Sequence, residues 1–342
     1  LEVLESNIGM LRRKIRNDAL KFRTVTLGSI TNQTAAIAYI EGIANKDLVD
    51  GMFDKISSIK LDGLPAIGYL EQSIISHPNS LFPQFLSTER PDKAMAALLE
   101  GRIVVLLEGS PVVLIAPVTF ISFFHSLDDY SNQWVLGSFL RIVRILGGTF
   151  IAVFMPALYI AITSFHYYAV PLELLLNLAK SRTVVPFPPI VEILILEITV
   201  ELIREAAIRL PTYIGTAVSV FAGLIIGQAA VEAGIVSNLV IVIVAATATA
   251  SYVIPSTDMA LSVRIVRFIF MLAASVFGII GIVVCTIFIL GHIIVLDSLG
   301  QPYFTPFSPF FSEGLKDSIV RLSLKKQKRR PVETRTGNKV RE

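Results

Sequence analysis

The chain has 342 residues, of which 53% are apolar and only 17% are charged, and its formal net charge is +3. Soluble domains carry about 25% charged residues, so this composition and a mean hydropathy of +0.68 argue against a wholly soluble protein. The length suits one soluble domain followed by a helical membrane bundle. Most basic residues lie in the first part of the chain and in its C-terminal tail. A position next to a membrane explains this distribution with fewer assumptions than nucleic-acid binding does.

Residues 1–140 predict a soluble domain of mixed α/β structure. Apolar residues at helical spacing within 1–20 indicate an amphipathic helix. Asn45 is a good N-cap for a helix that presents Leu48, Met52 and Ile56 on one face. Further elements are expected as a strand at 35–40, a helix at 67–75, a helix at 93–99 after Pro91, and a hairpin of strands 103–107 and 112–115. Because the chain begins at Leu1 without an initiator methionine, we expect this domain to be truncated at its N-terminal end.

Residues 141–299 predict a membrane domain. Four apolar stretches are candidate spans, namely 145–165, 214–231, 239–254 and 268–296, and the first is long enough to cross about 30 Å of hydrocarbon. The last stretch is longer than one perpendicular crossing requires. We therefore expect it to be tilted, to extend beyond the bilayer, or to kink near Gly278 or Gly281.

A fifth apolar stretch, 189–210, carries charges that the other four lack. Glu197, Glu201 and Glu205 recur every four residues and so fall on one face of a helix; we call these three residues the carboxylate stripe. Carboxylates are costly against lipid, so the helix either lies at the membrane interface or turns the stripe toward a protein-lined, hydrated space. Arg204 and Arg209 are candidate pairing partners.

The carboxylate stripe is the main functional feature of the sequence. If several copies surround an axis, each carboxylate becomes a ring, and such rings select cations. The alternative is an interfacial helix whose carboxylates are solvated or paired with Arg204 and Arg209. Gln228 is a secondary candidate for the same ion path, one helical turn before Glu232, although Glu232 could simply mark the membrane edge.

No feature predicts catalysis, a cofactor or a metal site. The sequence has neither a nucleophile elbow nor a phosphate-binding glycine loop, and the single Cys285 cannot form an internal disulfide. The stretch 302–311 is rich in proline and aromatics and cannot form a regular helix, and the basic tail after Lys325 is expected to be disordered. The four histidines lack the spacing of metal ligands; they are His77, His125, His166 and His292.

The basic residues predict the topology. The positive-inside rule places the N-terminal domain, Arg141, Arg144 and the C-terminal tail in the cytosol. Both ends on one side require an even number of crossings, which four spans satisfy, so the Glu-rich helix is not expected to be a full independent crossing. The basic residues of the tail are Lys325, Lys326, Lys328, Arg329 and Arg330.

An ordered series of short motifs runs along the chain from about Ala36 to Phe311. The motifs are Ser87-Thr88-Glu89-Arg90-Pro91-Asp92, Leu98-Leu99-Glu100-Gly101-Arg102, Gly109-Ser110-Pro111, Ala116-Pro117-Val118-Thr119-Phe120, Arg204-Glu205-Ala206, Arg209-Leu210-Pro211, residues 227–237, Ile254-Pro255-Ser256 and Gly300-Gln301-Pro302-Tyr303. Together they resemble the A subunits of bacterial spore germination receptors of the GerA type. Several ordered motifs are far more specific than one short pattern.

The resemblance implies a receptor complex in the inner membrane of a dormant spore that responds to small nutrients such as amino acids or sugars. In that family the A subunit assembles with an integral membrane B subunit and a lipoprotein C subunit, and the B subunit is the usual candidate for nutrient binding. The A subunit is regarded as an oligomeric, nutrient-gated ion channel. The soluble region of the family is longer than the one found here, and a channel-forming paralogue without a nutrient-binding partner carries similar motifs.

We therefore expect an α-helical polytopic membrane bundle preceded by a mixed α/β soluble domain. The function expected is that of a homo-oligomeric, pentameric subunit that conducts monovalent cations along the carboxylate stripe and Gln228. The expected partners are further copies of the chain, the B and C subunits and membrane lipids, and no nucleic acid. A non-conducting scaffold or signalling subunit is the first alternative, and a secondary transporter is the second, weakened by the lack of an inverted repeat of broken helices.

Overall fold

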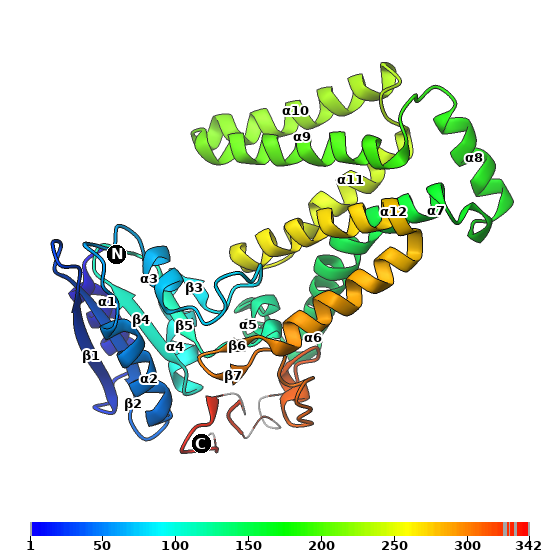
Figure 1. Cartoon of the computed structure of the whole chain (residues 1–342). Coiled ribbons are helices and arrows are strands. Elements are labelled where there is room, and N and C mark those ends of the chain that lie inside the picture. The colour runs from blue at the N-terminus through cyan, green and yellow to red at the C-terminus, as the bar shows by residue number, and fades with distance from the viewer. Residues whose placement is uncertain (1, 324–326, 328, 332–333, 341–342) are drawn as a thin grey trace. The chain divides into compact units, whose positions relative to one another are not determined.

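The structure is a computed structural model of the chain that describes residues 2–323, 327, 329–331 and 334–340 (Figure 1). The chain forms two compact units. The sheet unit consists of Leu1–Val143, Pro255–Met259 and Leu290–Glu342, and the helical unit consists of Arg144–Ile254 and Ala260–Ile289.

A five-stranded antiparallel sheet of order β1-β2-β4-β5-β3 forms the centre of the sheet unit. The central strand β4 is buried along its whole length, as its run of β-branched and aliphatic residues predicts for a strand covered on both faces. The predicted hairpin is confirmed, because β4 pairs with β5 in the register Val104 to Ile115. The strands are β1 (Leu20–Leu27), β2 (Gln33–Ile40), β3 (Leu86–Thr88), β4 (Ile103–Leu107) and β5 (Val113–Ala116).

Helices cover this sheet on both sides. On one face α2 (Lys46–Ser57) and α3 (Ile67–Ile74) bury Met52, Ile56 and Leu70 against Ile37 and Val105. Val104 points to the opposite face, since successive side chains of a strand alternate. There α1 (Leu4–Lys14) and α4 (Pro91–Leu99) contact each other and β4.

The predicted starts of α2 and α4 are confirmed. The Asn45 side chain accepts a hydrogen bond of 2.9 Å from the Asp47 backbone N–H, which satisfies one of the free donors of the first turn. Pro91 occupies the first turn of α4, where its missing N–H costs no hydrogen bond. Two short elements, η1 (Phe120–Phe124) and α5 (Asp128–Ser131), then lead to the first long helix.

That long helix, Trp134–Ser164, is continuous over 31 residues. It consists of α6 (Trp134–Ile145), a π-helical segment η2 (Leu146–Phe154) and α7 (Met155–Ser164). The remaining helical elements are η3 (Tyr167–Ala169), α8 (Leu172–Arg182), α9 (Pro189–Arg209), α10 (Thr212–Glu232), α11 (Asn238–Ser251) and α12 (Thr257–Val295). The predicted Glu-rich helix is thus α9.

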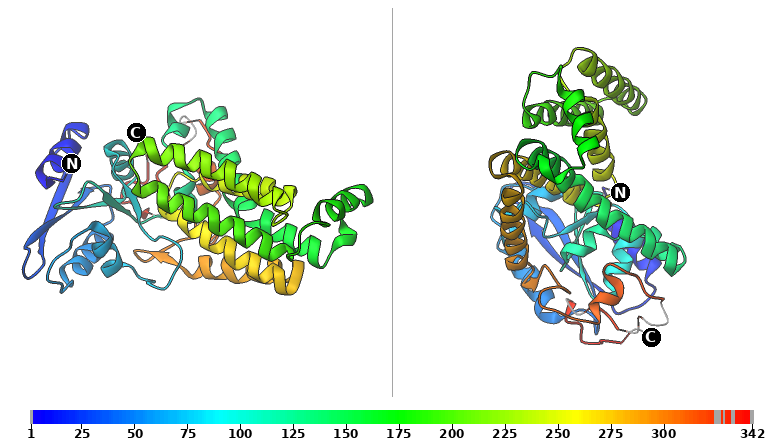
Figure 2. Two further views of the ribbon diagram at one scale, coloured as in Figure 1. Left: turned by 90° about the horizontal axis from the view of Figure 1, so that it is seen from above. Right: turned by 90° about the vertical axis from the view of Figure 1, so that its right-hand side faces the viewer.

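Within the helical unit, α9 and α10 run side by side as a hairpin joined at Leu210 and Pro211 (Figures 1 and 2). α11 contacts α9, α7 and η2. The contact side of α9 buries Ile193 and Leu196, and α11 buries Val240 and Val244. Other apolar residues of α9 and α10, among them Leu202 and Leu224, are exposed.

The longest helix, α12, bends at Gly278, whose backbone has φ 60° and ψ −138°. The kink predicted near Gly278 or Gly281 is therefore confirmed, at Gly278. At 1.5 Å per residue the arms before and after it are about 30 Å and about 25 Å long. Glycine is required at position 278, because a Cβ there would lie 2.8 Å from Cε1 of His166. Residues other than glycine also rarely adopt this backbone conformation.

Both ends of α12 belong to the sheet unit. At the first end, Ser87 donates a hydrogen bond of 2.6 Å to Asp258, and the N-cap is Ser256, which accepts from the Met259 N–H. At the second end, His292 lies 2.9 Å from the Ser80 hydroxyl. Just beyond it, His77 lies 2.7 Å from Asp297.

Two helices of the described chain are long and apolar enough to cross a membrane, Trp134–Ser164 and Thr257–Val295. The apolar helix Asn238–Ser251 is shorter than a span, and within α10 the segment Gly223–Glu232 is apolar. The expected fold is therefore shown in its coarse form, a sheet-containing N-terminal domain and a helix-rich remainder with two candidate spans. The polytopic bundle of four spans remains a prediction.

After α12 the chain returns to the sheet unit. A short ladder pairs β6 (Asp297–Ser298) with β7 (Gln301–Pro302), and residues 303–310 form turns, which agrees with the prediction that no regular helix forms there. Tyr303 is fully buried and donates a hydrogen bond of 2.7 Å to the Pro83 carbonyl. A 3₁₀ turn, η4 (Gly314–Asp317), follows. Lys325, Lys326 and Lys328 lie outside the described residues, so the prediction of a disordered tail is not tested on them.

Candidate functional site

The carboxylate stripe lies on α9, which begins at Pro189 and ends at Arg209. The exposed fraction of its side chains rises along the helix, from 0% at Glu197 to 27% at Glu201 and 58% at Glu205. The buried end contacts Thr247 of α11 and Arg267 of α12, and at the exposed end Glu205 pairs with Arg209 of the same helix. The stripe therefore runs from the interior of the helical unit to its surface.

Glu197 forms a buried ion pair with Arg267 of α12. An Oε atom of Glu197 lies 3.1 Å from an Nη atom of Arg267, and neither side chain is exposed. The Thr247 hydroxyl of α11 donates a hydrogen bond of 2.9 Å to the other carboxylate oxygen. Residues of three helices thus meet at this carboxylate. They give it the ion pair and the hydrogen bond that a buried charge requires.

Glu201 is shared among three arginines. Its carboxylate lies 2.7 Å from Arg264, 3.2 Å from Arg204 and 3.3 Å from Arg267. Arg204 also donates to the Ser251 hydroxyl at 3.2 Å and to the Tyr252 hydroxyl at 3.1 Å. Its guanidinium covers the Tyr252 ring at 4.6 Å from the centroid, which adds a cation–π attraction.

Glu205 and Arg209 form a separate pair near the end of α9. They lie 2.7 Å apart at i, i+4 spacing, and both side chains are more than half exposed. Gln228 of α10 is also exposed, and it donates a hydrogen bond of 3.0 Å to Glu232 one turn later. The polar partner that the structure gives Gln228 is therefore on its own helix.

The cluster around Glu197 and Glu201 carries more positive than negative charge. Two carboxylates face the three guanidinium groups of Arg204, Arg264 and Arg267. Among the described residues, Nε and Nη1 of Arg267 have no hydrogen-bond partner although the side chain is fully buried. An unsatisfied buried donor is costly, so the cluster has one positive charge in excess and is not saturated in hydrogen bonds.

Glu192, which lies off the carboxylate stripe, is a further buried carboxylate of α9. It pairs with Arg182 of α8 at 3.1 Å and accepts a hydrogen bond of 3.1 Å from the Ser237 N–H. It therefore fixes the start of α9 to α8 and to the turn before α11. Sequence spacing did not single it out, because its partners lie in other elements.

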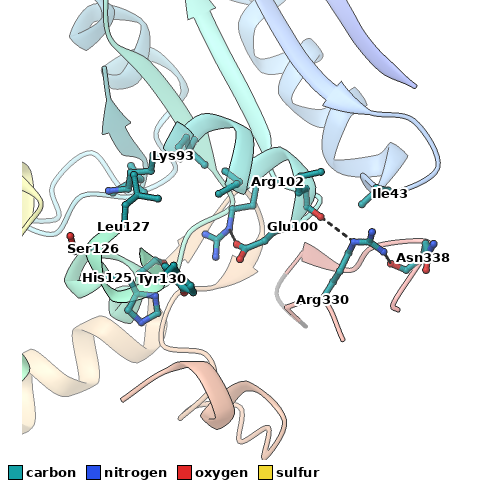
Figure 3. Close-up of a pocket in the computed structure, with 16 residues that line it drawn as sticks. Ile43, Lys93, Glu100, Arg102, His125, Ser126, Leu127, Tyr130, Arg330 and Asn338 are labelled. Atoms are coloured by element: carbon teal, nitrogen blue, oxygen red, sulfur yellow. Dashed lines mark hydrogen bonds and ion pairs between the residues drawn. The ribbon is translucent and has the colours of Figure 1, made fainter. Parts of the chain in front are cut away.

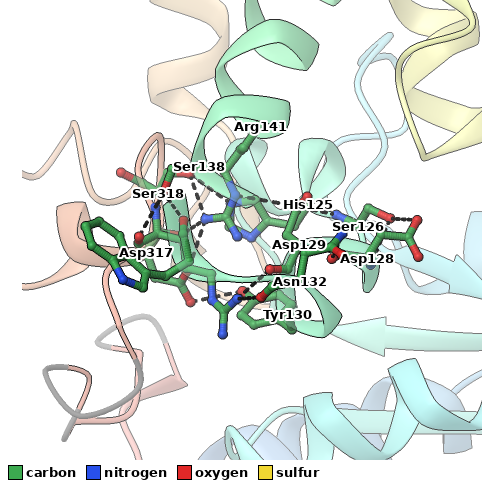
Figure 4. A network of polar contacts seen from close by, with 12 residues as sticks. His125, Ser126, Asp128, Asp129, Tyr130, Asn132, Ser138, Arg141, Asp317 and Ser318 are labelled. Carbon is green, nitrogen blue, oxygen red and sulfur yellow. Dashed lines mark hydrogen bonds and ion pairs between the residues drawn. The ribbon is translucent and has the colours of Figure 1, made fainter. Parts of the chain in front are cut away.

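The sheet unit contains a second buried polar network (Figure 4). The fully buried Arg141 of α6 lies 3.3 Å from Asp129 and 2.9 Å from Asp317, and it donates to the Ser318 carbonyl at 3.1 Å. Tyr130 donates to Asp317 at 2.9 Å, and burial raises the pKa of both Tyr130 and Asp317. Arg141 thus joins the first turns of the long helix to the segment after η4.

The described part of the chain contains no group of three or more His, Cys, Asp or Glu residues arranged to hold a metal ion. The histidines instead make single contacts, such as His77 with Asp297 and His292 with Ser80. The four histidines, whose spacing in the sequence is not that of metal ligands, form no such group among these residues.

Comparison with known proteins gives a consistent family assignment. The family described as "Bacillus/Clostridium GerA spore germination protein" matches residues 1–333. The chain is 41% identical over 341 residues to spore germination protein GerQA of Bacillus cereus, covering 100% of this chain and 68% of that protein. It is also 41% identical over 341 residues to spore germination protein KA of Bacillus subtilis, covering 100% of this chain and 62% of that protein.

Among solved structures, the chain is similar to the N-terminal domain of the A subunit of the Bacillus megaterium spore germinant receptor GerK3. The identity is 31%, the match covers 35% of this chain and 95% of that chain, and the TM-score is 0.29. The chain spans about two thirds of the length of the two relatives above.

Proposed function

The chain belongs to the Bacillus/Clostridium GerA family of spore germination proteins, and we propose that it is part of the A subunit of a spore germinant receptor that works in a membrane. The family match over nearly the whole chain and the names of its relatives support this function. Two helices with the length and hydropathy of membrane spans support the location. The inner membrane of the spore is the proposed site, with the N-terminal domain and the tail on the cytoplasmic side.

We further propose that several copies, five in the simplest assembly, form a cation channel with the carboxylate stripe along the ion path. The single observation behind this proposal is the alignment of Glu197, Glu201 and Glu205 on one face of α9. Repeated around an axis, these residues form carboxylate rings, which favour cations. Exposed Glu205 and Gln228 would contact ions first. The arginines that neutralise Glu197 and Glu201 would hold the closed state.

Opening of the channel then requires that the ion pairs of Arg264 and Arg267 with Glu201 are partly broken. A nutrient can drive this change only if it binds the open assembly more tightly than the closed one. The integral membrane B subunit and the lipoprotein C subunit are the proposed partners, and the B subunit is the proposed place of nutrient binding.

Flux of monovalent cations through the full-length protein in liposomes tests conduction, alone and with the B and C subunits and nutrient. The informative variant is Glu205→Gln, because its exposed pair contributes little to stability. We expect a severalfold loss of flux with unchanged assembly. Glu173→Gln, an exposed carboxylate of α8 away from the stripe, is the matched control and should conduct normally.

A non-conducting scaffold or signalling subunit is the second candidate. The pairing of Glu197 and Glu201 with arginines of the same chain favours it, since such pairs also serve to hold helices together. A scaffold predicts that the complete complex with nutrient shows no flux, or flux that neither Glu205→Gln nor Glu201→Gln changes. Either result would remove the conduction proposal and leave the receptor proposal in place. Flux without the B subunit would instead favour the channel-forming paralogue.

A further inference from the structure

The sheet unit contains a cavity of about 610 Å³ (Figure 3). It lies beside α4 and is also lined by the segment of η1 and α5 and by two tail residues, Arg330 and Asn338. Its volume falls in the range of small-molecule sites, about 300–1,000 Å³. The cavity is far from the carboxylate stripe in sequence, and the inference drawn from it does not depend on ion conduction.

Most of the wall is apolar. The side chain of Leu86 comes from the edge strand β3 and that of Ile115 from its neighbour β5. Those of Ala96 and Leu99 come from α4, and that of Leu127 precedes α5. Such a wall suits a hydrocarbon group, because apolar surface gains free energy when a ligand covers it.

The polar part of the wall is cationic. Lys93, Arg102 and Arg330 line the cavity, against one carboxylate, Glu100. Arg102 is buried, lies 3.2 Å from Glu100 and donates a hydrogen bond of 2.9 Å to the Pro117 carbonyl. Arg330 donates to the Leu99 carbonyl at 3.0 Å. The described residues of the lining therefore include three cations and one carboxylate, an excess of two positive charges.

Lys93 differs from the two arginines because no described residue accepts a hydrogen bond from its ammonium group. Burial lowers the pKa of Lys93, and the charges of Arg102 and Arg90 lower it further, against a smaller opposite effect of Asp92. The Asp92 carboxylate is itself engaged at 2.8 Å by Arg90. An ammonium group in such surroundings lacks the anion that would make its burial favourable.

His125 does not add to the positive charge. Its Nε2 lies 3.1 Å from the Ser318 carbonyl, and because a carbonyl only accepts, Nε2 carries the hydrogen. Burial and the nearby Arg141 keep the pKa of His125 well below its usual value, so the ring is neutral. Tyr130 donates its hydroxyl hydrogen to Asp317. Neither residue competes with Lys93 for an anion.

We propose that this cavity binds a small organic anion, an oxyanion head group on an apolar body, with Lys93 as the residue that pairs with the head group. Arg102 and Arg330 supply the surrounding positive potential, and the apolar wall covers the body of the ligand. Since Arg330 comes from the tail, binding would also hold the tail on the sheet unit.

The test uses the full-length protein in lipid nanodiscs and four probes. Hexanoate and hexyl phosphate carry both parts of the ligand, 1-hexanol carries only the apolar body, and inorganic phosphate carries only the head group. Affinity is measured by calorimetry. Hydrogen exchange of peptides covering 91–102 and 120–130 shows whether binding occurs at the cavity and not in the lipid.

We expect hexanoate or hexyl phosphate to protect these peptides, and 1-hexanol and inorganic phosphate to bind at least tenfold more weakly. Whichever of hexanoate and hexyl phosphate binds with the higher affinity identifies the head group as carboxylate or phosphate. Lys93→Met should weaken binding by roughly ten- to a hundredfold, the range for a hydrogen bond to a charged group. Lys60→Met, at an exposed lysine, should leave the affinity unchanged.

Equal protection by hexanoate and 1-hexanol would overturn the proposal, and so would unchanged affinity in Lys93→Met. Should Lys93→Met fold poorly, as judged by exchange in the core strand β4, Arg330→Met takes its place with an expected severalfold loss. Protection confined to peptides outside the cavity would likewise reject this site.

Discussion

Arg267 of α12 and Glu197 of α9 lie 3.1 Å apart, and neither side chain has any exposed area. The pair joins α9 to α12, two helices separated in sequence by α10 and α11. The attraction within such a pair is offset by the cost of taking both charges out of water. What matters for stability is therefore that both partners are present together.

Removing one partner of this pair should be strongly destabilising. Arg267→Met should lower the stability of the protein by about 3–5 kcal/mol, because Glu197 then stays buried without its guanidinium partner. Glu197→Gln should cost less, because Arg267 keeps Glu201 at 3.3 Å. Thermal unfolding of the full-length protein in detergent measures the change.

The double variant Glu197→Gln/Arg267→Met should lose less than the sum of the two single losses, since no uncompensated charge remains at this position. Glu205→Gln, which breaks an exposed pair, should cost less than about 1 kcal/mol. An Arg267→Met protein as stable as the parent would show that the pair contributes nothing.

The bend of α12 should tolerate no side chain. Gly278→Ala places a Cβ 2.8 Å from the His166 ring at a backbone φ of 60°, and the strain should cost about 1–3 kcal/mol. Gly291→Ala in the second arm of the same helix is the matched control, because a Cβ at that position would meet no neighbouring atom within 4 Å. It should be neutral or gain up to about 1 kcal/mol of helix propensity. Equal melting temperatures for the two variants would contradict the prediction.

The stability of the sheet unit should depend on pH through Glu71 of α3. Burial raises the pKa of the Glu71 carboxyl from 4.5 to about 7, and the charge of Asp258 adds to the shift. The folded protein therefore binds this proton more tightly than the unfolded chain does. The contribution of Glu71 is greatest below about pH 4.5, falls as the pH rises toward 7, and is constant above that.

Glu71→Gln removes this dependence. The melting temperature of the variant minus that of the parent should increase between about pH 5 and pH 7 and then level off. Glu89→Gln, at an exposed carboxylate before α4, should show no such rise. A difference that stays flat from pH 5 to pH 8 would rule out a raised pKa at Glu71.

The network around Arg141 should hold the segment after η4 in place. Arg141→Lys keeps the charge but loses the planar fork that reaches Asp129 and Asp317 together. Hydrogen exchange of the peptide covering 314–322 should accelerate about tenfold or more, because its contacts with α6 are lost. Arg13→Lys, at an exposed position of α1, should leave that peptide unchanged, and equal protection in both variants would argue against a structural role for Arg141.

Local signals predicted much of the sheet unit. Asn45 and Pro91 mark helix starts through the chemistry of the first turn, and the strand at 35–40 and the hairpin follow from runs of apolar residues. Strand β1 was missed. Polar residues, among them Lys21 and Arg23, lie between its apolar ones, and the predicted helix over 1–20 ended at its first residue, whereas α1 ends at Lys14.

The partners of the carboxylate stripe show where local spacing is insufficient. Arg204 and Arg209 lie three and four residues from Glu201 and Glu205, so the helix alone brings them within ion-pair distance. Arg264 and Arg267 reach Glu201 only because α12 packs on α9. At the start of α12, Ser256 is the N-cap, and Asp258 accepts a hydrogen bond from Ser87, a residue far away in the sequence.

The spacing of the carboxylate stripe has a consequence for how α9 and α12 are aligned. Four residues advance a helix by about 6 Å, and Arg267 already contacts two carboxylates that are one such step apart. A slide of α9 by one step would place Glu201 and Glu205 where Glu197 and Glu201 now stand, so the charges match equally well in two positions. The ion pairs alone therefore do not fix how α9 is aligned with α12, and the apolar packing of α9, which buries Ile193 and Leu196, has to contribute to that alignment.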